Sequence, residues 1–177
     1  KQVVEELRRE FRKTLETFVT LSPVLGFMRW LRSEATPALP PDEQTTLAAL
    51  DDPAWAQNAQ QAAALRPLIE RLAATYFLEA RDGAGRARDP VARFHLGNGA
   101  RLERINWLGD ISRKGLNESA GVMVNYLYES DEIEDNHEAY ANNNEIVASS
   151  AVRRMTRSSG RIDKNKNSTA KMPPVIV

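Results

Sequence analysis

The spacing of apolar residues changes several times along this chain, and each change predicts a different element. Apolar residues three to four positions apart predict an amphipathic helix over residues 2–13. Residues 16–21 are rich in strand formers and predict a strand, which Ser22 and Pro23 end because proline cannot donate to a strand ladder. Residues 26–33 predict a short helix. Its inward-facing side chains are expected to be Phe27, Trp30 and Leu31.

Helical spacing dominates the next fifty residues. Helices are predicted at residues 42–50 and 53–61, the second opened by Asp52 as cap and Pro53 in the first turn. The strongest pattern predicts a helix over residues 62–80. The apolar face of that helix comprises Leu65, Leu68, Ile69, Leu72, Ala73, Tyr76 and Phe77.

The second half of the chain returns to strands. Asp89 and Pro90 repeat the cap signature and predict a short helix that ends at Gly97. Residues 101–107 and 121–128 predict strands. In the first of these, strict alternation assigns one face to Leu102, Arg104 and Asn106 and the other to Glu103, Ile105 and Trp107.

Two helices and a polar tail complete the pattern. The helices are predicted at residues 131–140 and 144–156, and residues 157–177 form a polar segment with the composition of a disordered tail. Strands interleaved with helices indicate a protein of mixed α and β structure.

Composition narrows the classes of partner. Lys and Arg number 24 and Asp and Glu number 24, so the net charge is zero and nucleic acid is not expected as a partner. No apolar run approaches the roughly 20 residues that span a bilayer, so no membrane partner is expected. The absence of cysteine and of a signal-peptide pattern is consistent with a reducing compartment, and we expect a cytoplasmic protein.

Ser22 and His95 are the side chains best suited to chemistry. A serine at a strand end presents its hydroxyl where binding sites are common, although serine also ends strands without any further role. The bend at Gly97 and Gly99 leaves open backbone near the His95 ring, and histidine can deliver a proton near neutral pH. No metal-ligand spacing surrounds His95, so zinc is not expected. From the residues alone, a structural role is the simpler explanation for both.

Other polar side chains have two explanations as well. Asn98 and Asn106 are able to donate to a carbonyl or enolate oxygen, but turn chemistry and strand hydrogen bonding explain them more simply. Tyr126 and Tyr128 share one face of a strand, where packing is the simpler role. His137 lies on an acidic helix and is predicted to be a surface residue.

Several runs, in this order, resemble the malonyl-CoA decarboxylase family. Its catalytic-histidine run is similar to FHLGNGA at residues 94–100 followed by RINW at 104–107. Its Leu-Ser-Pro loop is similar to FVTLSPVLGFMRWL at 18–31. Its last strand and the C-terminal helices of bacterial members resemble GVMVNYLY at 121–128 and the segment 130–155.

The resemblance implies a fold and a domain plan. The fold class would be α+β, with a GNAT-like (acetyltransferase-type) mixed sheet that holds coenzyme A at its splayed centre. Residues 1–156 would be the C-terminal portion of the catalytic domain, with a helical insertion at about 41–80, and 157–177 would be the tail. The chain starts at Lys1 inside a helical pattern without a cap, so we expect a fragment that is incomplete at its N-terminus.

The resemblance also implies an activity: decarboxylation of malonyl-CoA to acetyl-CoA and carbon dioxide. Ser22 would orient the malonyl carboxylate, His95 would donate the proton, and Tyr128 and Asn98 would join them in binding substrate. Coenzyme A is part of the substrate, and no metal or other cofactor is expected. The family's coenzyme A loop precedes this segment, so we expect little activity from it alone. A homo-oligomer is expected.

Two other functions stay open from the sequence. A coenzyme A-dependent N-acyltransferase would use the same fold and would need a cleft and a base for an amine. A non-catalytic, truncated domain would use its helical faces for contacts between subunits. Supplying amines alongside the acyl-CoA separates the first alternative from a decarboxylase.

Overall fold

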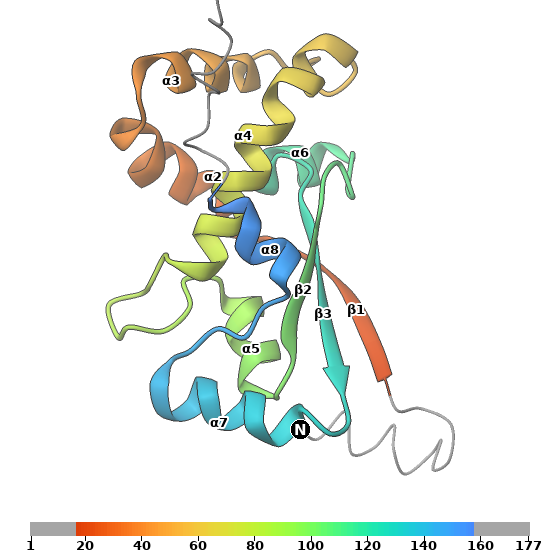
Figure 1. Cartoon of the computed structure of the whole chain (residues 1–177). Helices are drawn as coiled ribbons and strands as arrows, with labels where there is room; N and C mark the ends of the chain where they lie inside the picture. Colours follow the sequence, from red (N-terminus) through yellow and green to blue (C-terminus); the bar gives the residue numbers. More distant parts are fainter. Residues whose placement is uncertain (1–16, 158–177) are drawn as a thin grey trace, which may run out of the picture.

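A three-stranded antiparallel sheet is the centre of the part that the structure describes, residues 17–157 of this computed structural model (Figure 1). Its order is β1-β3-β2, so the last strand lies between the first two. The strands are β1 (Thr17–Pro23), β2 (Arg101–Asn106) and β3 (Met123–Glu129). The three predicted strands are therefore confirmed, with small shifts in their ends. Pro23 is included in β1, which is tolerated because β1 is an edge strand of this sheet.

One face of the sheet is defined by the pairing of β1 with β3. Phe18 is opposite Tyr128, Thr20 opposite Tyr126, and Ser22 opposite Val124. Directly opposite residues of an antiparallel pair share a face, so these six side chains form three adjacent rows. Burial in β3 alternates strictly, with Val124, Tyr126 and Tyr128 buried.

Helices cover the inner side of the sheet and extend beyond its end. Helices α4 (Ala59–Leu78), α5 (Pro90–Gly97) and α8 (Ser150–Met155) all contact β2. Figure 1 shows α5 and α8 beside the sheet and α7 (Ile133–Asn143) below them. The predicted apolar face of the long helix is confirmed, because all seven of its side chains are buried.

The segment after β1 turns through several short helices. These are α2 (Phe27–Trp30), a π-helical turn (Leu31–Ala35), a 3₁₀ turn (Thr36–Ala38), α3 (Pro41–Leu47) and a further 3₁₀ turn (Ala48–Asp51). Phe27, Trp30 and Leu31 are buried as predicted. Tyr76 of α4 packs against Phe27 and Trp30, which joins this segment to the long helix.

The predicted helix start at Asp52 and Pro53 is wrong. The Asp52 carboxylate accepts a hydrogen bond from the Ala54 amide at 2.9 Å in a local turn. Helix α4 begins later, where the Asn58 side chain accepts from the amides of Gln60 and Gln61. An asparagine cap of this kind satisfies two amides that the helix itself leaves unpaired.

Strict alternation along β2 is also wrong. A bulge lies between Leu102 and Arg104, and it brings Leu102 and Ile105 to buried positions although they are three residues apart. Helix α6 (Arg113–Ser119), which Ser112 caps, was not predicted from the sequence.

The predicted helix over 144–156 is shorter than expected. Only its second half is helical, because Ala148 forms a parallel bridge with Leu102 and Ser149 then caps α8. The predictions for residues 2–13 and 158–177 lie outside the described residues. Within the described part, no helix has the length and apolar character to cross a membrane.

Candidate active site

Ser22 and His95, which are 73 residues apart in the chain, lie together on the inner face of the sheet. The Ser22 Oγ and His95 Nε2 atoms are 3.3 Å apart. Ser22 is near the end of β1 and is 6% exposed, while His95 projects from α5 and is half-buried. A hydroxyl and an imidazole at this separation can hydrogen-bond to each other, and both can contact the same substrate group.

The His95 imidazole lies along the rows of the sheet. Its ring stacks on Tyr126 of the middle row, with centroids 4.3 Å apart and planes 18° apart. Its Nε2 atom faces Ser22 of one outer row, and its Nδ1 atom is 2.7 Å from the hydroxyl of Tyr128 in the other. Two in-plane contacts and one face contact therefore fix the position of the ring.

Thr20 and Phe18, which were not predicted as site residues, extend this arrangement. The Thr20 hydroxyl lies 3.3 Å from Ser22 Oγ, and the Phe18 ring stacks on Tyr128 with centroids 4.6 Å apart. The period of two along β1 places residues 18, 20 and 22 on one face, which is the signal that predicts them. Thr20, Ser22, His95 and Tyr128 thus form one line of polar groups.

A buried aspartate fixes the start of the helix that carries His95. Asp89 Oδ1 accepts from the amides of Val91 and Ala92, each at 2.9 Å, which confirms the predicted cap. The Tyr76 hydroxyl donates to Asp89 Oδ2 at 3.5 Å. Burial raises the pKa of Asp89, although its hydrogen bonds act in the opposite direction.

The end of the same helix is tied to α7. His137 is half-buried and its Nδ1 donates to the Gly97 carbonyl at 2.7 Å, so the prediction of a surface residue is wrong. Gly99 has a φ of +85°, and a side chain there would strike the carbonyl oxygen of Ile133. The contact between α5 and α7 therefore depends on the glycine at position 99.

The two candidate asparagines have local partners. The Asn98 amide donates to the Phe94 carbonyl at 2.6 Å, at the end of α5. The Asn106 amide donates to Asn125 Oδ1 at 2.8 Å, within the sheet. These contacts agree with the turn and strand explanations given to the two residues by the sequence.

Burial keeps the site uncharged near neutral pH. Burial of the imidazole lowers the pKa of His95 below its ordinary value of 6.5. Burial raises the pKa of Tyr128 to about 12 and that of Tyr126 well above 10.0. A neutral imidazole has one nitrogen that donates and one that accepts, so it can be a donor to one neighbour and an acceptor from the other.

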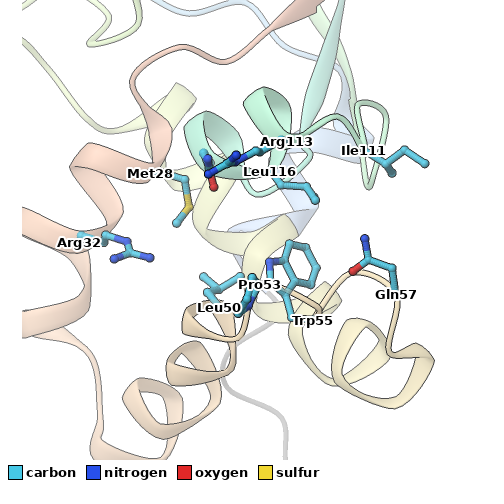
Figure 2. Close-up of a pocket in the computed structure, with 10 residues that line it drawn as sticks. Met28, Arg32, Leu50, Pro53, Trp55, Gln57, Ile111, Arg113 and Leu116 are labelled. Carbon is cyan, nitrogen blue, oxygen red and sulfur yellow. The ribbon is translucent and has the colours of Figure 1, made fainter.

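A separate pocket of about 410 Å³ lies between the α2 segment, the turn after α3 and α6 (Figure 2). Met28, Leu50 and Trp55 give it apolar walls, and Arg32 and Arg113 give it two cationic groups. Arg32 is already paired with Asp51 at 3.2 Å. Neither Ser22 nor His95 lines this pocket, so it is distinct from the line of polar groups on the sheet.

A family model described as the malonyl-CoA decarboxylase C-terminal domain matches residues 1–170. The chain belongs to this family. The resemblance inferred from the sequence runs is therefore confirmed. Among the described residues of this family member, no three histidine, aspartate or glutamate side chains lie together in a group that could hold a metal ion.

Curated malonyl-CoA decarboxylases are similar to this chain. The mitochondrial protein of Rattus norvegicus is 37% identical over 174 residues, covering 86% of this chain and 35% of the rat protein. The mitochondrial protein of Anser anser anser is 36% identical, covering 86% of this chain and 34% of the goose protein. The chain thus spans about a third of the length of these decarboxylases.

Solved structures of bacterial malonyl-CoA decarboxylases share the fold. The crystal structure from Rhodopseudomonas palustris matches with a TM-score of 0.80 and 51% identity, over 87% of this chain and 36% of that one. The crystal structure from Agrobacterium vitis matches with a TM-score of 0.80 and 50% identity, over 88% of this chain and 39% of that one. The mixed α and β architecture of this chain, with its small antiparallel sheet, is similar to the matched part of these malonyl-CoA decarboxylase structures.

Proposed function

We propose that the protein carrying this chain decarboxylates malonyl-CoA to acetyl-CoA and carbon dioxide. Membership of the malonyl-CoA decarboxylase C-terminal domain family supports the substrate and the reaction. The 3.3 Å approach of Ser22 Oγ to His95 Nε2 is the observation that carries the assignment of roles. It places a hydroxyl that can bind a carboxylate beside a nitrogen that can supply a proton.

In the first step, Ser22 donates its hydrogen bond to the malonyl carboxylate and orients it. The bond between the carboxylate carbon and the α-carbon then breaks, and carbon dioxide leaves. The electron pair moves into the thioester, whose oxygen becomes an enolate oxygen. A fixed donor to such an oxygen contributes about 3–4 kcal/mol to the transition state. Asn98, at the end of α5, remains our proposed substrate-binding donor.

In the second step, His95 gives the proton on Nε2 to the α-carbon, which completes the acetyl group, and a proton from water then restores the neutral ring. A thioester enolate is a strong base, so a neutral imidazole suffices as the acid. In this proposal the Tyr128 hydroxyl donates to Nδ1, so the only proton on the neutral ring is at Nε2. Proton delivery by a positioned group contributes about 10²- to 10⁴-fold to the rate. Neither step needs a metal, biotin or a redox group.

The sheet itself supports a proposal about the whole fold. We infer that β1-β3-β2 belongs to a larger GNAT-like (acetyltransferase-type) sheet, with residues 41–80 as a helical insertion. The support is that β1 is an edge strand among the described residues and carries Ser22 at its end. Coenzyme A would lie beyond that open edge. We also propose that the protein forms a homo-oligomer and is located in the cytoplasm.

The direct test supplies the full-length protein with malonyl-CoA, with and without amines, and measures carbon dioxide, acetyl-CoA and acylated amine. We expect acetyl-CoA and carbon dioxide in equal amounts, and at least an about 100-fold loss in Ser22→Ala and in His95→Asn. Ser33→Ala is the control, since Ser33 is exposed and donates to the Arg29 carbonyl, away from the site. An amine product, or near-normal turnover in either site variant, would overturn the proposal.

A further inference from the structure

We propose that Tyr126 is a positioning residue, whose ring holds the His95 imidazole in the orientation that faces Ser22. This role rests on the proposed decarboxylation, because an effect of Tyr126 on kcat presupposes that reaction. The hydrogen-bond partners of the two His95 nitrogens are Ser22 and Tyr128, whereas the Tyr126 ring stacks on the face of the imidazole, with ring centroids 4.3 Å apart and planes 18° apart. Stacking of this kind restrains out-of-plane rotation of the imidazole, which its two in-plane hydrogen bonds do not restrain.

Tyr126 is a rigid support because of its place in the sheet. It lies on the central strand, opposite Thr20 of β1 on one side and Leu102 of β2 on the other. The tyrosine is 0% exposed, and Thr20 and Leu102 belong to strands that hydrogen-bond β3 from both edges. Side chains of a central, fully packed strand have little room to change rotamer.

The support and the Nδ1 partner come from the same strand. Tyr126 and Tyr128 are two residues apart and face the same way, so their spacing is fixed at about 7 Å by the geometry of a strand. The stack with Tyr126 therefore restrains the plane of the imidazole, and the contact with Tyr128 restrains its rotation within that plane. Together they leave one orientation, in which Nε2 lies 3.3 Å from Ser22 Oγ.

The ring of Tyr126, and not its hydroxyl, restrains the His95 imidazole. The hydroxyl is buried and has no hydrogen-bond partner among the described residues. Phenylalanine would present the same flat face without that unpaired group. The proposal therefore distinguishes two substitutions that remove different parts of one side chain.

The test compares Tyr126→Phe with Tyr126→Met in the full-length protein. Methionine fills much of the volume but offers no flat face. We expect Tyr126→Met to lower kcat about 10- to 100-fold with KM within about twofold, because small misplacements of a reacting group cost about that much. Tyr126→Phe should keep kcat within about twofold of wild type. Tyr140→Met is the matched control, a buried tyrosine on α7 whose hydroxyl accepts from the Ala87 amide.

A second measurement does not depend on turnover. In proton NMR, ring protons of His95 that lie over an aromatic face resonate upfield, and the His95→Asn variant assigns them. The upfield shift should be present in wild type and Tyr126→Phe and absent in Tyr126→Met. A wild type with this shift but no decarboxylation would refute the proposed function and leave the stack intact. No upfield shift in wild type, or normal kcat in a folded Tyr126→Met, would overturn the role of Tyr126.

Discussion

His95 Nδ1 and the Tyr128 hydroxyl lie 2.7 Å apart, on the side of the imidazole that faces away from Ser22. A phenol thus occupies the place where many serine–histidine sites have a carboxylate. A carboxylate would stabilise a protonated imidazole, whereas a phenol with a pKa of about 12 is neutral and brings no charge. The lowered pKa of His95 agrees with a site organised around the neutral ring.

Replacing Tyr128 by phenylalanine tests this partnership. The ring that Phe18 stacks on is kept, and only the bond to His95 Nδ1 is lost. We expect an about tenfold or greater loss of kcat and about 1 kcal/mol of stability, which is typical for one hydrogen bond. Steady-state kinetics and urea unfolding measure the two effects.

Tyr140→Phe is the control for that substitution. It also removes one hydroxyl, which accepts from the Ala87 amide at 3.3 Å, and it should leave kcat unchanged. Equal activity of Tyr128→Phe and wild type would show that the tautomer of His95 does not depend on this phenol.

The burial of His95 predicts how stability depends on pH. The pKa of His95 in the folded protein lies below the ordinary value of 6.5, so the unfolded chain binds the proton first as pH falls. The contribution of His95 to the free energy of unfolding is therefore at its maximum above pH 6.5, and it is lost as the pH decreases toward the pKa of His95 in the folded protein. Urea unfolding at a series of pH values between about 7.5 and 5 measures it.

The His95→Asn variant isolates this contribution. Its free energy of unfolding should fall less than that of wild type over the same pH range, because the titrating ring is absent. Parallel pH curves for the two proteins would contradict the assignment of a lowered pKa to His95.

The two glycines after His95 should respond differently to alanine. A methyl group added at Gly97 would meet open space, and the backbone there is ordinary, so Gly97→Ala should be neutral or stabilise by up to about 1 kcal/mol. Gly99→Ala combines a φ of +85° with a collision against Ile133 and should cost more than about 1 kcal/mol. Thermal unfolding of both variants measures the difference. Similar stability in the two would mean that α5 and α7 do not pack as described.

Helix caps and amphipathic faces were predicted from the sequence where neighbouring residues alone determine them. The Asp89 cap and the buried face of α4 both follow from residues near one another in the chain. Asp52, like Asp89, is followed directly by a proline, but it caps no helix. The N-cap of α4 is Asn58, six residues further along the chain. A cap residue shows where a helix is able to begin, and packing then decides which cap is used.

The candidate site was predictable only in part for a similar reason. The alternation along β1 and β3 places Ser22, Tyr126 and Tyr128 on one face, but nothing local places His95 above them. That contact depends on the strand order β1-β3-β2, which joins segments about 100 residues apart. The family resemblance implied only that Ser22 and His95 act on the same substrate. The bulge in β2 and the bond from His137 to Gly97 likewise depend on long-range packing.

The central claim is that Ser22 and His95 act as one unit on one malonyl group, and a double-mutant cycle tests it most directly. The measurement is kcat/KM for acetyl-CoA formation in the full-length wild type, Ser22→Ala, His95→Asn and the double variant. Each single substitution should lower kcat/KM about 100-fold or more. The kcat/KM of the double variant should lie within about threefold of that of the less active single variant, as for residues that work together. Losses that multiply, or near-normal turnover in either single variant, would contradict the account.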